Sequence, residues 1–451
     1  MKKNHFSLCA ALGLAALLML GGALFSQETQ ISPQDYKARR DKLCSVISDG
    51  VAILVNTSTP AGFGRTRPNS DFYYLTGVNV PNAKLILVPE NVARKAASAE
   101  YWKSTLYLPT KDPRRGVWDD VQLFPGKEAL QETGIDNTAD LSAFETAVSR
   151  LATITDVVYI ASRSGAAARP GASAEIPFAE TVKRLLPGAR IKDLTFIFGD
   201  LRLTKSSKEI EIMKKACAIT AEAFKESARI AKPGVWEYEI EALCDYVFRR
   251  NNCDGNAFLI VGSGPNSTIL HHSSNDRQMK DGDLVVIDIG ALYHATVTDL
   301  TRTIPVSGVY SPEQKKVYAV VLEAQKKAIS MVRPGVTLAQ LHDAAMGVIA
   351  KAGYEKYFIH FLSHTLFGGL ADKPSSLGLS NPSRLSDKPL KAGSMFTIEP
   401  GIYIPEKNLG IRIEDDILVT ANGCEILTKD APKEIDEIEK LMKEKPVIII
   451  K

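Results

Sequence analysis

The stretch "DGDLVVIDIGALYHATVTDLTRTIPVSG", residues 281–308, places carboxylates among strand-forming residues. The apolar run from Leu284 to Ile289 predicts a buried strand, which Asp288 interrupts. Asp299 follows eleven residues later, after a short loop, so pairing of the two strands would bring both carboxylates together. Each carboxylate needs a partner, because a buried unpaired charge is costly. A salt bridge, for example between Asp299 and Arg302, would satisfy that need structurally.

The sequence beyond residue 390 supplies more acidic residues within apolar runs. "GSMFTIEPGIYI", residues 393–404, places Glu399 at the end of one such run. "GIRIEDDILVT", residues 410–420, alternates apolar and polar residues. That alternation predicts a strand with Arg412 and Glu414 on the same face.

"HFLSHTLFGGLADKP", residues 360–374, adds His360 and His364 in an apolar setting. Four carboxylates in buried strands cannot all be ionised without compensation, and four negative charges match two divalent cations. Oxygen-rich sites with a single imidazole suit Mn²⁺, and suit Co²⁺ or Zn²⁺ less well. Paired metals of this kind activate a bridging water. The candidate set is Asp288, Asp299, His364, Glu399 and Glu414.

The same order of elements occurs twice in the C-terminal part of the chain. A helix that starts at a Ser206–Glu209 capping box ends at "KPGV", residues 232–235, and a second helix follows. A helix that starts at Ser311 ends at "RPGV", residues 333–336, and another helix follows. The offset of 101 residues indicates an internal duplication with pseudo-two-fold symmetry. A site between the two halves would draw residues from both.

The N-terminal segment has the pattern of an export signal. Lys2 and Lys3 precede an apolar run at residues 6–25, so we expect residues 1–26 to be a signal peptide. The run is long for a signal, and an uncleaved membrane anchor is the alternative. Either interpretation places the body of the protein outside the cytoplasm, in the periplasm or the extracellular space.

The composition is that of a folded protein with no electrostatic sign of a nucleic-acid partner. The 451 residues carry 55 basic and 52 acidic side chains, a formal net charge of +3. This near-balance disfavours nucleic-acid binding. No GxSxG motif is present, which disfavours a serine hydrolase, and the "GSGPNS" loop at residues 262–267 lacks the lysine of a phosphate loop.

Several blocks together resemble the pita-bread metallopeptidases. The spacing Asp-x10-Asp, followed by His, Glu and Glu, is similar to the family's five-ligand dinuclear site. The blocks "VGSGPNSTILHHSSND", "TIEPGIYI" and "RPNSDFYYLTGVNVPNAKLILV" are most similar to the aminopeptidase P branch, and the similarity runs from about residue 33 to about residue 440. The resemblance implies an α+β fold. A smaller creatinase-like α/β domain, residues 32–198, would precede a creatinase/methionine aminopeptidase-like pita-bread domain, residues 201–445.

The resemblance also implies an activity and roles for single residues. The family branch removes an N-terminal residue that precedes proline, so a peptide with proline at its second position is the expected substrate. Two divalent metals are the expected cofactors. The implied catalytic residues are Glu399 as acid/base, His271 and His360 as substrate-contacting histidines, and Arg412 as the residue that orients the Glu414 ligand. Asp71 and Trp118 resemble residues that reach a neighbouring subunit, which implies a homo-oligomer, a dimer or tetramer formed through the N-terminal domain.

The chain departs from the family pattern at a few positions. Ala371 stands where the family has a second active-site histidine, and Phe361 replaces a small residue. Ala257 stands where the branch has a tyrosine. Losing one donor of this kind slows an enzyme by about 10²–10³ without abolishing its activity. The site is therefore expected to retain its metal ligands and to lack one helper.

Other interpretations remain at this point. His272 is an alternative to its neighbour His271, and His360 could be an ordinary buried histidine. The whole protein could be a prolidase, or a creatinase-like hydrolase, although creatinase-like members lack the metal ligands. It could also be a pseudoenzyme that binds peptides, an interpretation that Ala371 favours and the five retained ligands disfavour.

Overall fold

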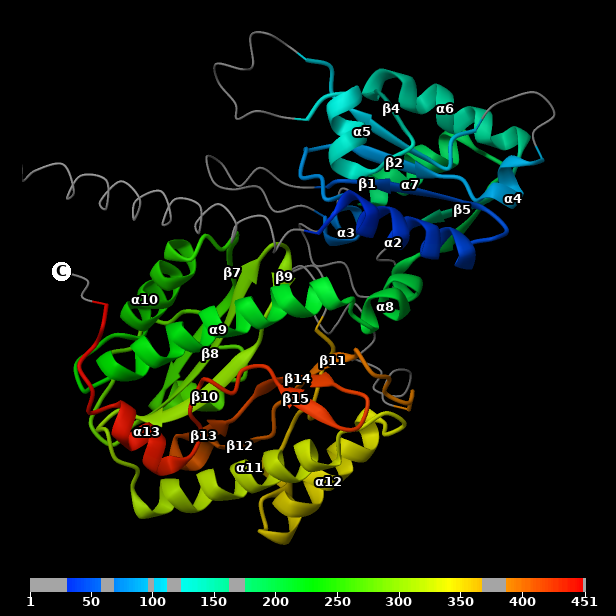
Figure 1. Cartoon of the computed structure of the whole chain (residues 1–451). Helices are drawn as coiled ribbons and strands as arrows, with labels where there is room; N and C mark the ends of the chain where they lie inside the picture. The colour runs from blue at the N-terminus through cyan, green and yellow to red at the C-terminus, as the bar shows by residue number, and fades with distance from the viewer. Residues whose placement is uncertain are drawn as a thin grey trace, which may run out of the picture.

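The computed structural model describes residues 31–57, 69–95, 101–111, 123–161, 175–366 and 387–448. Within these ranges the chain forms one mixed sheet with its own helices near the N-terminus, and a second, larger set of strands and helices (Figure 1). No helix in these ranges is long and apolar enough to cross a bilayer. The predicted signal, residues 1–26, lies outside the described residues.

The N-terminal part is built on a six-stranded sheet with the order β4-β3-β2-β1-β5-β6. Apolar side chains of β1 alternate between two separate cores, because successive residues of a strand point to opposite faces. The α/β domain expected from the sequence is confirmed. Its strands are β1 Val51–Val55, β2 Lys84–Leu87, β3 Ser104–Leu108, β4 Asn137–Asp140, β5 Val157–Ile160 and β6 Arg190–Asp193. Its helices are α2 Pro33–Val46, α3 Ser70–Thr76, α4 Glu90–Ala93, α5 Lys127–Thr133, α6 Phe144–Arg150 and α7 Glu175–Leu185.

Helix α8, Thr195–Leu203, leads from this sheet into the second part of the chain (Figure 1). The domain boundary that the sequence suggests at residues 198–201 falls inside this helix. The buried side chain of Arg202 forms an ion pair with Asp71 of α3 at 3.2 Å. This ion pair ties the end of the connecting helix to the N-terminal part.

The C-terminal part consists of two similar runs of helices and strands. The first run is α9 Ser207–Ile230, α10 Glu237–Arg250, β7 Gly255–Ser263, β8 Leu284–Tyr293, β9 Thr296–Val297 and β10 Leu300–Pro305. The second is α11 Pro312–Met331, α12 Leu338–Lys351, β11 Met395–Ile398, β12 Gly401–Ile404, β13 Leu409–Arg412, β14 Asp415–Val419 and β15 Cys424–Ile426, followed by α13 Ile435–Leu441. The sheets have the orders β10-β8-β7, β11-β14-β15 and β12-β13.

The two turns that prompted the idea of a duplication have the same structure. Gly234 and Gly335 adopt φ values of 94° and 92°, a region that glycine enters without strain. Each glycine N–H donates to a carbonyl 2.9 Å away, of Met279 in the first half and of Leu390 in the second. The predicted duplication is therefore confirmed at the level of backbone hydrogen bonds. Apolar residues of both halves form one continuous core.

One predicted strand is wrong. Residues 410–420 do not form a single strand, because β13 ends at Arg412 and β14 begins at Asp415 in a different sheet. The backbone changes partners between them: the N–H of Glu414 donates to the carbonyl of Thr301 at 3.0 Å. Glu414 therefore lies in a link between two strands and does not share a strand face with Arg412.

Candidate metal centre

The first two acidic candidates lie on paired strands. Asp288 is within β8, and Asp299 immediately precedes β10. The two strands pair antiparallel, with Asp288 opposite Thr301. The pairing expected from the sequence is present, and both side chains are 10% exposed. Arg302 does not serve as their partner, because its guanidinium pairs with Asp415 at 2.7 Å.

The other two acidic candidates lie where strands end. Glu399 occupies the link between β11 and β12, and Glu414 occupies the link between β13 and β14. The hydroxyl of Thr301 donates to Glu414 at 2.6 Å. Since short links carry these glutamates, their side chains can turn away from the sheet faces and toward a common point.

His364 is held against β11 by backbone pairing. Its carbonyl accepts from the N–H of Thr397 at 2.9 Å, and the N–H of Glu399 donates to Leu362 at 2.8 Å. This pairing aims the imidazole at the carboxylates. Its Nε2 lies 3.1 Å from Asp299, 3.4 Å from Glu399 and 3.9 Å from Glu414. The ligand atoms of Asp299, His364 and Glu414 all lie within 4.8 Å of one another.

The carboxylates raise one another's proton affinity. Burial raises the pKa of Asp299 well above its usual range, and repulsion from Glu414 and Asp288 raises it further. Burial and repulsion from Glu414 likewise raise the pKa of Glu399. Burial, followed by repulsion from Asp288, raises the pKa of Glu414. Burial opposes protonation of His364, but Glu399 and Glu414 outweigh it and raise its pKa. Added positive charge would therefore stabilise the ionised form of these carboxylates.

The unsatisfied oxygens of this group fit a cation. Asp288 Oδ1 and Glu414 Oε1 are buried and accept no hydrogen bond from the described residues. Buried polar atoms in native structures are normally paired, so each orphaned oxygen calls for a partner. Carboxylate oxygens with one imidazole are a donor set that divalent metals accept. The residues present therefore fit divalent cations.

Arg412 holds Asp288 and not Glu414, contrary to the expected contact. Its Nη2 donates to Asp288 Oδ2 at 2.5 Å, and its Nε donates to the hydroxyl of Thr301 at 3.2 Å. Thr301 in turn donates to Glu414, so Arg412 reaches this glutamate only through Thr301. The cause is the end of β13 at Arg412, which separates the two side chains.

A chain of hydrogen bonds runs from Arg412 to His360. Arg412 Nη1 donates to the Tyr403 hydroxyl at 2.9 Å, and that hydroxyl lies 3.0 Å from His360 Nε2. His360 Nδ1 lies 2.9 Å from the carbonyl of Phe361. Because a carbonyl only accepts, the proton is on Nδ1, and Tyr403 donates to Nε2. Burial and the charge of Arg412 lower the pKa of His360 to about 3, so the ring is neutral.

The two adjacent histidines of the candidate site differ in burial. His271 is exposed, and the carbonyl of the preceding Leu270 lies 3.4 Å from Arg412 Nη2, so the backbone before His271 reaches the candidate centre. His272 is 8% exposed, and its Nε2 lies 3.1 Å from Glu237. Of the pair, His271 faces solvent and His272 faces the interior.

Sequence reasoning missed three residues that support the site: Thr301, Tyr403 and Asp416. Asp416 accepts the backbone N–H of Asp299 at 3.1 Å and lies 3.4 Å from the thiol of Cys217. The available signal was a polar group inside an apolar strand, as in the tyrosine of "GIYI". Because tyrosine is common in β-strands, the sequence pattern alone gives no indication that such a side chain supports a functional site.

Some predicted residues lie elsewhere or outside the described part. Ala371 and Trp118 lie outside the described residues. Asp71 lies in α3 and pairs with Arg202 within the same chain. Ala257 is buried at an irregularity of β7, where the pairing register with β8 shifts between Asn256 and Phe258.

Comparisons with known proteins identify this arrangement. Residues 211–421 match the model of metallopeptidase family M24, and residues 36–159 match the aminopeptidase P N-terminal domain. The chain is 31% identical to the Xaa-Pro aminopeptidase of Escherichia coli K12, over 92% of this chain and 98% of that protein. The chain belongs to metallopeptidase family M24. This M24 chain is accordingly an enzyme, a metallopeptidase that depends on divalent metal.

Two further matches distinguish branches of the family. The M24 chain is 40% identical to the Xaa-Pro dipeptidase of Pyrococcus horikoshii, but over only 56% of this chain and 70% of that protein. The solved structure of Escherichia coli aminopeptidase P with the inhibitor Pro-Leu covers 92% of this chain and 98% of that one, at 29% identity and a TM-score of 0.79. The pita-bread fold with an additional N-terminal domain is thus shown.

Proposed function

We propose that this M24 peptidase releases the N-terminal residue from peptides that carry proline at the second position. The observation that carries the proposal is the convergence of Asp299, Glu399 and Glu414 on His364 Nε2, at 3.1 to 3.9 Å. It occurs in a chain that covers 98% of an Xaa-Pro aminopeptidase. Dipeptidase activity is not favoured, because the match to a dipeptidase leaves nearly half of this chain uncovered.

Five residues would hold two divalent cations: Asp288, Asp299, His364, Glu399 and Glu414. The orphaned oxygens of Asp288 and Glu414 support this assignment, as does the mutual repulsion of the carboxylates. When bound, the cations supply a nucleophilic water and polarise the scissile carbonyl. We propose Mn²⁺ as the metal, since a set of four carboxylates and one imidazole suits it best.

The chain's own residues then position groups and move protons. Glu399 would accept the proton that the attacking water gives up and return it to the leaving proline nitrogen. Arg412 fixes the orientation of Asp288. The neutral ring of His360, whose tautomer Tyr403 and Phe361 set, contacts the substrate together with His271.

The proposed specificity follows from the chemistry of proline. The bond before proline has no amide hydrogen, and the ring restricts the preceding residue. A peptidase whose recognition relies on that N–H therefore handles the bond poorly. A site that binds the carbonyl and the free amine can dispense with it.

Three further features belong to this proposal. We propose a homo-oligomer formed through the N-terminal domain, with Asp71 and Trp118 near a neighbouring subunit's site. We propose export, directed by residues 1–26, with the apolar run at residues 6–25 as the alternative anchor. We propose that Ala371 replaces a helper histidine, and we expect the rate of hydrolysis to be about 10²–10³ lower than in a family member that has this histidine.

The first experiment is hydrolysis of an Xaa-Pro-Xaa tripeptide by the mature chain with added Mn²⁺. We expect metal-dependent release of the first residue by the native chain and none by the Glu399→Ala variant. An Xaa-Pro dipeptide tested in parallel distinguishes the prolidase alternative. Metal bound by the native chain without hydrolysis of either peptide would contradict the proposal and support a peptide-binding role.

A further inference from the structure

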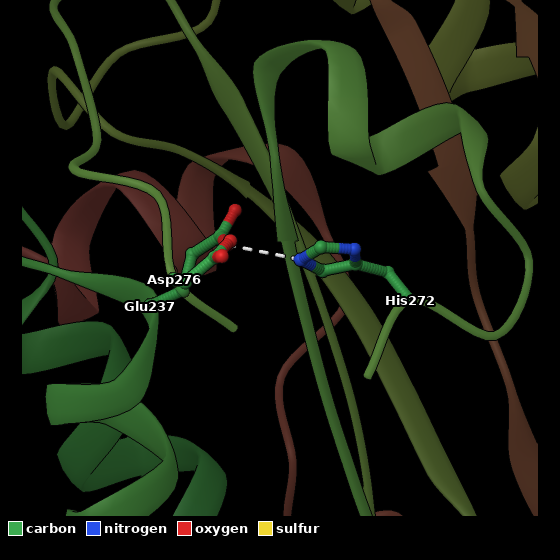
Figure 2. Close-up of side chains that lie close together, drawn as sticks. All are labelled: Glu237, His272 and Asp276. Atoms are coloured by element: carbon green, nitrogen blue, oxygen red, sulfur yellow. Dashed lines mark hydrogen bonds and ion pairs between the residues drawn. The ribbon is translucent and has the colours of Figure 1, made fainter. Parts of the chain in front are cut away.

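A second cluster of possible metal ligands lies at the start of α10. Figure 2 shows Glu237, His272 and Asp276 close together, with an ion pair joining Glu237 to His272. Their ligand atoms lie within 4.8 Å of one another. Metal binding would need open positions on the central carboxylate, so the partners of Glu237 decide what this cluster does.

The Glu237 carboxylate is already filled by protein donors. Its side chain is fully buried, and both oxygens accept hydrogen bonds. Asp276, by contrast, is exposed. The donors to Glu237 are the N–H and hydroxyl of Ser263 at 2.6 and 2.7 Å, the amide of Asn266 at 3.2 Å, the ring of His272 at 3.1 Å and the N–H of Arg277 at 3.1 Å. A cation would have to displace several of these donors before it could bind Glu237. The cluster is therefore not a preformed metal site.

All of these donors come from one loop. Residues 263–277 run from the end of β7 through the short helix η4, Gly264–Thr268, and past His271. The buried carboxylate of Glu237 on α10 therefore accepts hydrogen bonds from both ends and from the middle of residues 263–277, the segment that carries His271. His272 supplies the contact nearest to that residue, and as donor to a carboxylate its Nε2 carries the proton.

The opposite side of the loop of residues 263–277 packs closely against β13. The N–H of Gly410 donates to the hydroxyl of Ser267 at 2.9 Å, and a Cβ on Gly410 would approach the Ser267 carbonyl to 1.9 Å. Arg412 Nη2 lies 3.4 Å from the carbonyl of Leu270. The residue before His271 thus contacts the arginine that holds Asp288, and the residue after it contacts Glu237.

We infer that Glu237 and His272 are positioning residues for His271. The inference rests on the proposed function, in which His271 contacts the substrate. His272 anchors the loop in the interior while His271 projects to solvent, so the bond from His272 to Glu237 sets where the neighbouring imidazole stands. Loss of that bond lets the imidazole move by an ångström or so without touching any predicted metal ligand.

The test compares His272→Phe, which removes the donor, with His272→Gln, which retains an N–H donor. We expect His272→Phe to lower kcat/KM on the tripeptide by up to about 100-fold, the effect of a misplacement of about 1 Å. His272→Gln should remain close to the native chain, and so should Asp276→Asn, the control on the exposed member of the cluster. Bound metal should be equal in all variants.

A double-mutant cycle separates positioning from general support. In the His271→Ala background, His272→Phe should cause no further loss, because the residue through which it acts is gone. An additive loss in that background would overturn the inference, as would unchanged kcat/KM in His272→Phe. Equal losses in the Phe and Gln variants would do the same.

A second readout does not depend on activity. Amide hydrogen exchange in a peptide covering residues 264–272 should be faster in His272→Phe than in the native chain and in His272→Gln, with the thermal midpoint little changed. If the native chain cleaves no Xaa-Pro peptide, the proposed function fails, and exchange still decides whether His272 holds the loop. Unchanged exchange in His272→Phe overturns the inference in either case.

Discussion

Tyr403 illustrates how a single side chain connects the predicted residues. Its hydroxyl accepts from Arg412 and donates to His360, so it links the residue that holds Asp288 to a histidine of the substrate side. Burial raises the pKa of Tyr403 to about 12, which keeps its proton in place at working pH. The sequence presents this tyrosine as one residue of an apolar strand.

Replacing Tyr403 by Phe tests that link. The variant keeps the ring and loses the hydroxyl, so Arg412 and His360 each lose a partner. We expect kcat/KM to fall by about 10- to 100-fold, the range for residues that orient metal ligands. Steady-state kinetics on the tripeptide and metal analysis provide the measurement. Activity equal to that of the native chain would show that the hydroxyl is dispensable.

The neutral state of His360 predicts a pH dependence of stability. Its pKa is about 3 in the folded chain and about 6.5 when unfolded, so only the unfolded state binds the proton between these values. Stability therefore rises with pH across that window and falls as pH drops below about 6.5. At pH 5 the effect is about 2 kcal/mol.

Urea unfolding of the metal-free chain at pH 5 and pH 7.5 measures this effect. The native chain should lose about 2 kcal/mol more than the His360→Gln variant between the two conditions. The variant has no imidazole at this position and serves as the control. An identical pH dependence in both proteins would mean that His360 takes up its proton in the folded state.

At the scale of elements, the sequence predicts the features that neighbouring residues determine, such as the positions where helices begin. Helices α9 and α11 begin where the sequence predicts, after the capping box at Ser206 and the N-cap at Ser311. The strand break between Arg412 and Glu414 was not predicted, because the alternating pattern continues across it. The break comes from a change of pairing partner to Thr301, more than a hundred residues away in sequence, which no local pattern records.

The same division applies to the site. Spacing and residue type were sufficient to predict His364 and the acidic residues as one candidate set of metal ligands. The contacts of Arg412 with Asp288 and of Asp416 with Asp299 could not be predicted, since each joins strands that are far apart in the chain.

A buried ion network joins β10 to β14. Arg302 is fully buried and pairs with Asp415 at 2.7 Å, and Lys433 reaches the other oxygen of Asp415 at 2.5 Å. Burial opposes ionisation of Asp415, but both cations outweigh it and lower its pKa. The two sheets that supply the site residues are joined at this point.

Asp415→Asn should therefore destabilise the fold by about 3–5 kcal/mol, because Arg302 is left buried without its counter-charge. Lys326→Ala is the matched control: it removes an exposed ion pair with Glu434 and should change stability by less than about 1 kcal/mol. Chemical unfolding compares the two variants. A loss below about 1 kcal/mol in Asp415→Asn would show that other groups neutralise Arg302.

At the scale of the whole molecule, two compact parts are joined through α8 (Figure 1). One part carries the candidate centre, and the other is joined to it by the ion pair between Arg39 of α2 and Glu209 of α9 at 3.1 Å. The proposed signal precedes both.

Deletion of residues 1–26 should leave the peptidase active and change only its location. We expect the full chain in the exported fraction and the truncated chain in the cytoplasm, each with similar kcat/KM on the tripeptide. Cell fractionation with N-terminal sequencing of the mature chain makes the measurement. Equal distribution of both chains would refute the signal, and an intact residue 1 on an exported chain would indicate the anchor.

The candidate ligands are divided between the duplicated halves: Asp288 and Asp299 come from the first, and His364, Glu399 and Glu414 come from the second. Bound cations would therefore link the two halves, and cation binding would stabilise their association in the folded chain. At free metal 100 times its Kd, the coupling is worth about 2.7 kcal/mol. A chelator should lower the Tm of the native chain and leave that of His364→Ala unchanged. An equal response in both would place the metal somewhere other than the seam.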